Sequence, residues 1–276
     1  MTIAILLATY NGMERLPHLL DSILAQTNND WTIFVHDDGS TDGTLHFLKS
    51  FSAEHPERMV VLGEDVKHLG AKMNFCWLLN NVEADYYMFC DQDDEWMPTK
   101  VEDTLALVRK TETENPGLPV CVHTDLAVCD ANYNVVHPSL WKLSKVNPSW
   151  QEDPSMLLVA NCVTGCTMMF NEKVKALSAN IPDVVPMHDF WVAYQTASNG
   201  GVLTHLPKAT ILYCQHGGNE VGANNVGLGY VSGKLLGLKN VWKANCQQYN
   251  MAQSLAKMSV FRYVWLKFVF EVKRMF

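Results

Sequence analysis

The sequence DQDDE at residues 91–95 places four carboxylates within five residues, directly after the apolar run YYMFC. Carboxylate oxygens are natural protein ligands of Mg²⁺ and Mn²⁺, and a site with few of them leaves coordination positions for substrate phosphates. The cluster therefore predicts a divalent metal at the end of a strand. A solvated acidic turn that caps a helix starting at Pro98 is the alternative. An EF-hand loop is disfavoured because Trp96 occupies the position where that loop needs glycine.

A second polar cluster, HDDGSTDGT, occupies residues 36–44 and also follows an apolar run. Asp37 and Asp38 could bond a base edge or a ribose, while residues 40–42 could instead cap the next helix. The chain has no GxxxxGK[ST] pattern, and GLGYVSG at residues 227–233 lacks a preceding strand. Kinase-like and NAD-type nucleotide binding are therefore disfavoured.

Strands and helices must position these clusters, and the first half of the chain alternates between the two. Hydrophobic periodicity predicts strands at 3–9, 32–38, 58–65 and 86–91 and helices at 16–27, 44–51, 71–81 and 98–110. Strands that are apolar on both faces indicate a mainly parallel sheet covered on both sides. Ligands bind beyond the carboxyl ends of such strands, so we expect the polar clusters to face a cleft at one edge.

The second half has a different texture, and we place a boundary near residue 118. We expect a strand pair at 119–130, a strand or hairpin at 157–171, a helix at 188–200 and a strand at 202–214. A helical tail is expected from about Gly233. Its last stretch, VFRYVWLKFVFEVKRMF, mixes aromatic and basic residues, and such a helix either lies at an anionic membrane surface or packs on the domain.

Composition limits the function classes. The chain has 276 residues, 48% of them hydrophobic, and a net charge of −8, which argues against nucleic acid as a partner. Its eight cysteines form no CxxC pair and predict buried free thiols in a reducing compartment. Without a signal-peptide pattern or a run long enough to span a bilayer, we expect a cytoplasmic protein, either free or at the inner face of the cell membrane.

Taken together, four motifs resemble the nucleotide-sugar-binding half of the family 2 glycosyltransferases with the GT-A fold: ATYNG, DDGSTDGT, HLGAKMNF and DQDDEWMPTK. TDLAVCD, VTGCTMMFN, MHDFWVAY and YCQHGGNEVG extend the match and resemble bacterial rhamnosyltransferases of surface-polysaccharide synthesis. The resemblance spans residues 2–222. It implies an α/β fold with a mainly parallel Rossmann-like sheet and a mixed acceptor-binding half. The expected division is 1–118 for the donor half, 119–232 for the acceptor-binding and catalytic half, and 233–276 for the amphipathic helical tail.

The resemblance also implies site residues. The implied donor-binding positions are Thr9, Tyr10, Asn11, Asp38, Gly70, Asn74 and Asp91. Among them, Tyr10 would lie against the nucleobase, Asp38 would accept from a base N–H, and Asp91 would lie near the ribose. Asp93 and His216 would hold Mn²⁺ or Mg²⁺ against the diphosphate.

For catalysis, the resemblance implies that Asp189 is the base that takes the proton of the acceptor hydroxyl. The alternative is a purely structural role as a helix N-cap. His188 and Trp191 would shape the acceptor site, since an aromatic face packs well on a pyranose ring.

The implied reaction is a direct displacement with inversion at the anomeric carbon. The expected donor is dTDP-β-L-rhamnose and the expected acceptor a saccharide or lipid-linked glycan. A UDP-hexose or UDP-N-acetylhexosamine transferase is the alternative, and an inactive sugar-nucleotide-binding subunit is the non-enzymatic one. The tail gives a route to peripheral membrane association.

Overall fold

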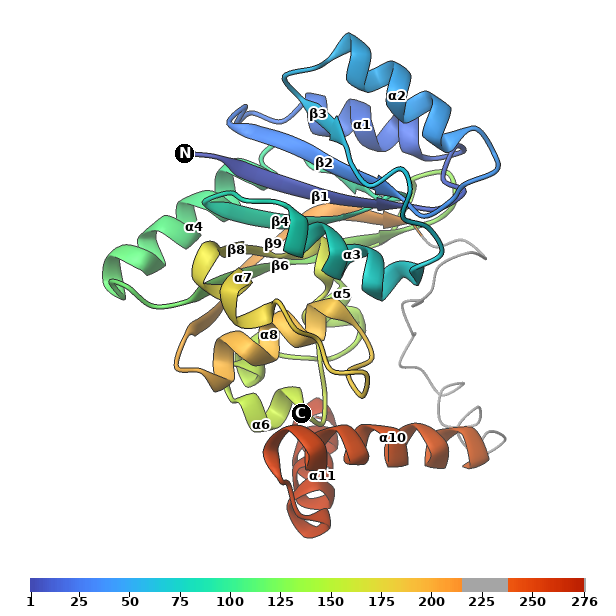
Figure 1. The fold of residues 1–276 in the computed structure, drawn as a ribbon. Coiled ribbons are helices and arrows are strands. Elements are labelled where there is room, and N and C mark those ends of the chain that lie inside the picture. The colour runs from blue at the N-terminus through green and yellow to red at the C-terminus, as the bar shows by residue number, and fades with distance from the viewer. Residues whose placement is uncertain (215–237, 276) are drawn as a thin grey trace.

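The computed structural model describes residues 1–214 and 238–275. Within them, the strands form one nine-stranded sheet in the order β3-β2-β1-β4-β8-β6-β9-β5, with β7 paired to β6 (Figure 1). The strands are β1 (Ile3–Thr9), β2 (Trp31–Asp37), β3 (Met59–Val61), β4 (Tyr86–Asp91), β5 (Glu95–Trp96), β6 (Val120–Cys129), β7 (Val135–His137), β8 (Met169–Asn171) and β9 (Val202–Cys214).

The helices cover both faces of this sheet and extend below it (Figure 1). They are α1 (Leu16–Leu24), α2 (Thr44–Glu54), α3 (Gly70–Asn81), α4 (Lys100–Glu114), α5 (Leu140–Leu143), α6 (Pro154–Leu157), α7 (Glu172–Ser178), α8 (His188–Ser198), α10 (Leu238–Ala256) and α11 (Val260–Met275), with short 3₁₀ helices η1 (Pro148–Glu152) and η2 (Gly165–Thr167). The fold is a mostly parallel α/β arrangement with C-terminal helices, as the sequence predicted.

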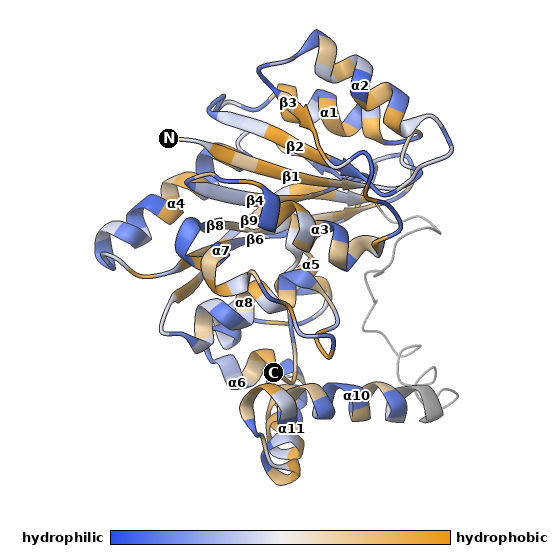
Figure 2. Cartoon of the chain, viewed as in Figure 1, coloured by the Kyte–Doolittle hydropathy of each residue, from blue (hydrophilic) through white to orange (hydrophobic). Residues whose placement is uncertain are grey.

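Two apolar cores lie on the two faces, because successive side chains of a strand point in opposite directions. Ile5 and Leu7 of β1 pack toward α1, α2 and α4, whereas Ala4 and Leu6 pack toward α3 and α8. The helices are apolar on the faces turned to the sheet (Figure 2). Burial on both sides explains the near-continuous hydrophobic runs of the first four strands.

The strands β1 to β4 of the first half are parallel, and their register brings the carboxyl ends of β1, β2 and β4 together. Thr9 is paired with Asp37 across β1 and β2, and Ala8 is paired with Asp91 across β1 and β4. The expected boundary near residue 118 falls between α4 and β6. The same sheet nevertheless continues into the second half, where β8 runs antiparallel to both β4 and β6, and β9 runs parallel to β6.

Two expected elements of the second half were wrong. Residues 120–129 form one buried strand and not a strand pair, because both of its faces are covered. Residues 157–171 form a strand only from Met169 to Asn171. The preceding apolar residues, such as Leu157 and Val159, are buried in an irregular segment packed into the α3–α8 core.

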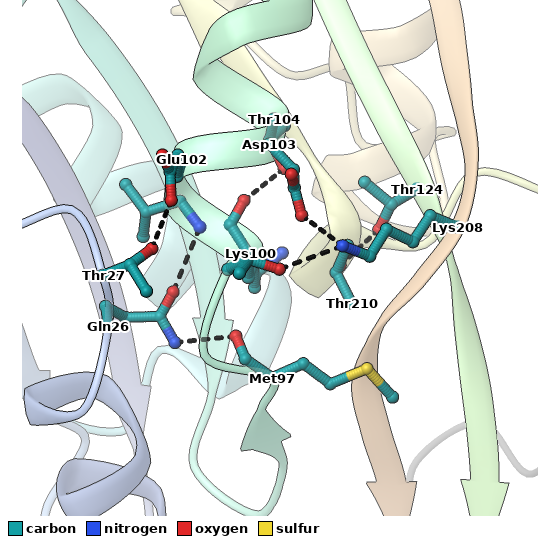
Figure 3. A network of polar contacts seen from close by, with 12 residues as sticks. Gln26, Thr27, Met97, Lys100, Glu102, Asp103, Thr104, Thr124, Lys208 and Thr210 are labelled. Carbon is teal, nitrogen blue, oxygen red and sulfur yellow. Dashed lines mark hydrogen bonds and ion pairs between the residues drawn. The ribbon is translucent and has the colours of Figure 1, made fainter.

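Contacts on both sides of the acidic loop hold it in place. β5 follows the loop and pairs with Leu212 and Ile211 of β9. The start of α4 is tied to Gln26, which accepts from the Val101 N–H and donates to the Met97 carbonyl, and to Lys208, which contacts Asp103 (Figure 3). The loop between β4 and β5 is therefore anchored at each end.

Candidate active site

A cavity of about 1950 Å³ opens at the carboxyl ends of the parallel strands. Residues from both halves and from α10 and α11 line it. The expected site residues in its wall are Thr9, Tyr10, Asp38, Gly70, Asn74, Asp91, Asp93, His188 and Asp189. Asn11 and Trp191 are not in the wall, and His216 lies outside the described residues. The polar clusters therefore meet in one hollow, as expected from their places at strand ends.

Asp38 fixes the start of α3. Its two carboxylate oxygens accept from the N–H groups of Leu69 at 2.7 Å and Gly70 at 2.8 Å. Gly70 has φ of +73°, a left-handed conformation that suits glycine. Each carboxylate oxygen has a second lone pair, so Asp38 remains able to accept from a ligand N–H while it holds the helix.

Hydrogen bonds also join the first two loops. Asp37 accepts from the hydroxyls of Thr9 and Ser40, and Asn11 accepts from the Thr41 N–H at 2.8 Å. Asn11 has φ of +49°, a left-handed conformation, and is not among the residues that line the cavity. Its hydrogen bonds connect the two loops.

Tyr10 presents an exposed ring at the cavity, with 54% of its surface accessible. Gln92 holds the backbone of Tyr10 at both polar groups, accepting from its N–H at 2.9 Å and donating to its carbonyl at 3.0 Å. A side chain at Gly12 would collide with Gln92. Sequence reasoning missed both Gln92 and Gly12, although Gln92 stands inside the acidic motif.

Asn74 serves the end of β2. Its amide oxygen lies 2.9 Å from His36 Nδ1, and its NH₂ group donates to the His36 carbonyl at 3.3 Å. Both residues are buried, and the His36 ring also packs on Trp77. These contacts occupy both polar groups of the Asn74 amide. The side chain therefore holds the end of β2 in the cavity wall.

The acidic cluster divides between the cavity and the core. Asp91 and Asp93 line the cavity, whereas Asp94 is buried beside the Cys166 thiol. Burial, with the charges of Asp91 and Asp93, raises the pKa of Asp94 well above its usual range. The fully buried Lys100 is also close enough to interact with Asp94, and burial lowers its pKa to about 8.

The donor set fits a hard divalent cation. The ligand atoms of Asp91, Asp94 and Cys166 lie within 4.8 Å of one another, and the two carboxylates of this group offer oxygen atoms. Oxygen ligands suit Mg²⁺ and Mn²⁺, and the open side of such a site leaves room for phosphate oxygens. Asp91 and Asp94 are the carboxylates of this group, and Asp93, the expected metal ligand, lines the cavity but does not belong to the group.

Asp189 lies in the first turn of α8 and reaches the cavity from the opposite half. Its carboxylate accepts from the N–H groups of Gly165 at 3.1 Å and Phe190 at 2.6 Å. Burial raises the pKa of Asp189 to about 6, although these hydrogen bonds act in the opposite direction. A carboxylate with a pKa near neutrality is suited to general base chemistry. Asp189 is therefore a carboxylate that lines the cavity and has a pKa of about 6.

Gly165 is a further residue that the sequence did not single out. A Cβ atom there would lie 2.9 Å from His188 Nε2 and 3.3 Å from Asp189 Cβ. Only glycine allows η2 to approach α8 this closely and to donate its N–H to Asp189. The motif VTGCTMMFN contains this glycine, but nothing in its spacing indicates the contact.

The two expected acceptor residues are both largely buried, and only His188 also lines the cavity. His188 is stacked on Phe75 at 4.1 Å and packs edge-on against Phe89 at 4.5 Å, and burial lowers its pKa to about 3. Trp191 is 7% exposed and donates from its indole N–H to the Ser178 carbonyl. Trp191 is also absent from the residues that line the cavity, unlike Asp189. The structure thus leaves Trp191 no open face for a sugar.

Comparisons with known proteins agree with this architecture. The family model for Glycosyl transferase family 2 matches residues 4–175. The chain is 28% identical to the dTDP-rhamnosyl transferase RfbG of Shigella flexneri over 79% of this chain and 74% of that protein. It is also 35% identical to the glycosyltransferase GlyA of Streptococcus pneumoniae, over 37% of this chain and 14% of that protein.

Solved structures show the same fold at low identity. The Staphylococcus aureus TarS 1–349 structure in complex with UDP-GlcNAc superposes with a TM-score of 0.65 at 15% identity, covering 100% of this chain and 73% of that one. The mannosyltransferase PcManGT of Pyrobaculum calidifontis, in complex with GDP-Man and Mn²⁺, gives 0.57 at 18% identity over 80% of this chain and 58% of that one.

Proposed function

The chain belongs to glycosyl transferase family 2, and we propose that it is an inverting, metal-dependent enzyme that transfers L-rhamnose from dTDP-β-L-rhamnose to a saccharide of a cell-surface polysaccharide. The observation that carries the proposal is the convergence of Tyr10, Asp38, Asp91, Asp93 and Asp189 on one cavity. The similarity to a dTDP-rhamnosyl transferase supports rhamnose as the sugar.

In this proposal, residues 1–118 bind the donor. The exposed ring of Tyr10 stacks on the nucleobase, and Asp38 accepts from a base N–H with the lone pairs that α3 leaves available. Asp91 lies beside the ribose. Asp93 holds the cation, and His216 would complete its ligand set. When bound, Mn²⁺ or Mg²⁺ supplies positive charge beside the diphosphate that leaves.

The half formed by residues 119–232 binds the acceptor and supplies the base. Asp189 takes the proton of the acceptor hydroxyl as that oxygen forms a bond to the anomeric carbon. The bond from the anomeric carbon to the diphosphate oxygen breaks on the opposite side, and its electron pair leaves with the nucleotide. A β-linked donor thereby gives an α-linked rhamnoside, and no covalent enzyme intermediate is required.

A UDP-linked hexose or N-acetylhexosamine is the alternative donor. The similarity in fold to TarS, whose structure contains UDP-GlcNAc, supports this alternative, although 15% identity carries only the fold. An inactive sugar-nucleotide-binding subunit is the remaining alternative. Against it stands the meeting of Asp93 and Asp189 in the lining of one cavity.

Calorimetric titration of dTDP-rhamnose, UDP-glucose and UDP-GlcNAc in the presence of Mn²⁺ tests the donor. We expect dTDP-rhamnose to bind at least about tenfold more tightly than either UDP-sugar, a difference of about 1.4 kcal/mol. Tighter binding of a UDP-sugar would remove rhamnose from the proposal. Release of free nucleotide diphosphate with a saccharide acceptor separates an enzyme from a binding subunit.

A further inference from the structure

Helix α11 is apolar on two opposite faces. One face packs on the domain, where Tyr263 is 5% and Phe270 is 8% exposed. The other face carries Phe261, Trp265 and Phe268, which are 85%, 62% and 59% exposed. We call this second set, with Val260 and Val264 beside it, the outer face of α11. Large apolar side chains gathered on an exposed surface usually mark an interaction site.

The outer face is exposed on a helix that is firmly attached. Phe270 packs edge-on against Trp150 at 5.8 Å, and the Arg274 guanidinium donates two hydrogen bonds to the Ser144 carbonyl at 3.1 and 2.8 Å. Arg262 donates to the Ser155 hydroxyl at 2.8 Å. These contacts fix α11 against the domain, next to α6 and at the end of the molecule away from β1, β2 and β3 (Figure 1).

The charge of this region is opposite to that of the rest of the chain. Residues 238–276 contain seven lysines and arginines and one glutamate, a net charge of +6, whereas the whole chain has a net charge of −8. Within the described residues, no helix is long and apolar enough to cross a bilayer. An amphipathic helix with exposed Trp and Phe and nearby basic residues suits the interface of an anionic membrane. A second copy of the chain fits less well, because two basic regions would face one another.

The outer face borders the candidate active site. Val264 and Phe268 are exposed and also line the cavity, as does Lys267 between them. The same cavity contains Asp93 and Asp189. A surface that contacts α11 would therefore lie next to the end of the cavity remote from the parallel strands.

We propose that the outer face of α11 docks on an anionic lipid bilayer and presents the cavity to an acceptor glycan whose lipid anchor lies in that bilayer. The lipid-linked acceptor rests on the proposed function, whereas the docking surface does not. The aromatic side chains insert at the headgroup level, and the exposed Lys243 of α10 and Lys257 between the two helices interact with anionic headgroups.

Vesicle co-sedimentation of the full chain tests this proposal without donor or acceptor. We expect binding to phosphatidylcholine vesicles that contain about one third phosphatidylglycerol, and binding at least about tenfold weaker to pure phosphatidylcholine or in 0.5 M salt. The double variant Phe261→Ser, Trp265→Ser should bind the anionic vesicles at least about tenfold more weakly, because it removes two inserting side chains. The matched control is Val135→Ser, Val136→Ser, which removes two exposed apolar residues of β7 and should bind as the unaltered chain does.

Equal binding of the double variant and the unaltered chain would overturn the proposal, as would failure of the unaltered chain to bind anionic vesicles. Light scattering adds a further outcome: a dimer that the double variant dissociates would make a second copy the occupant of this face. Calorimetry of the nucleotide-sugar donor on the same samples shows that the variants are folded. It also separates the two ideas, since donor binding without vesicle binding would refute docking and leave the proposed function intact.

Discussion

The two ends of the cavity are built in opposite ways. At the donor end, carboxylates such as Asp37 and Asp38 are fixed by hydrogen bonds to neighbouring loops. At the other end, α11 contributes exposed aromatic and basic side chains and is held by packing and a few polar contacts. The difference indicates a division of labour, in which the rigid end fixes a small charged ligand and the exposed end meets a larger surface.

Replacing the base between the two ends should have the largest effect. We expect Asp189→Asn to lower kcat by at least about 10²-fold, the usual contribution of a general base, with donor affinity nearly unchanged. Initial-rate kinetics on a soluble acceptor measure the first quantity, and calorimetry measures the second. An unaltered kcat would exclude Asp189 as the base.

The second largest effect is expected for donor affinity, which should depend on the bound cation. Asp93→Ala should weaken donor binding in Mn²⁺ by at least about tenfold, because an oxygen ligand of the ion is lost. The matched control is Asp103→Ala, which removes an acidic residue on α4 that contacts Lys208 outside the cavity. Donor binding that is as tight with a chelator as with Mn²⁺ would contradict the metal assignment.

The same base predicts a pH dependence. Because the pKa of Asp189 is raised to about 6, the ionised base is present above pH 6 and lost below it. We expect kcat/KM at pH 5 to be about one tenth of its plateau value. The sign for stability is opposite: ionisation of a carboxyl whose pKa is raised by folding removes stability as the pH rises toward 6. Asp189→Asn should abolish this limb of the rate profile.

The attachment of α3 through Asp38 can be tested by measuring the free energy of unfolding. Asp38→Ala leaves the N–H groups of Leu69 and Gly70 without their acceptor and should lower the free energy of unfolding by about 1–2 kcal/mol. Asp38→Asn keeps one acceptor oxygen and should lose less. Urea unfolding of the two variants measures the difference, and equal losses would mean that the carboxylate does not hold α3.

The smallest effect is expected at the exposed end. Arg262→Gln removes a hydrogen bond to Ser155 at the surface and should change the free energy of unfolding by less than about 1 kcal/mol. The same urea measurement serves here. A loss larger than that of Asp38→Ala would reverse the comparison between the two ends.

The sequence was sufficient to predict which edge of the sheet carries the site. Runs ending at Thr9, Asp38 and Asp91 predicted parallel strands, and the structure places the ends of β1, β2 and β4 side by side. It was not sufficient to predict the direction of side chains on α8. That direction depends on α7, because the Trp191 indole N–H donates to the carbonyl of Ser178 at the end of that helix.

Close approaches between distant segments were also beyond the reach of sequence patterns. Gly165 is required because η2 meets His188 and Asp189, a contact across 23 and 24 residues. The irregular segment before it was mistaken for a strand because burial under α8 produces the same apolar composition as a sheet. For the tail, the sequence left two alternatives, a helix at a membrane surface and a helix packed on the domain. In the structure, the inner face of α11 packs on the domain and its outer face is exposed.

The span between β4 and β5 has a consequence for affinity. Only residues 92–94 connect these strands, and both belong to the same sheet. Ordering a mobile residue takes about 1–2 kcal/mol of conformational entropy, so a floppy loop would weaken every ligand that it had to close upon. Here folding has already imposed that order before any cation or pyrophosphate arrives. The loop of residues 92–94 is thus preorganised. A ligand that binds there does not lose binding free energy to ordering the loop.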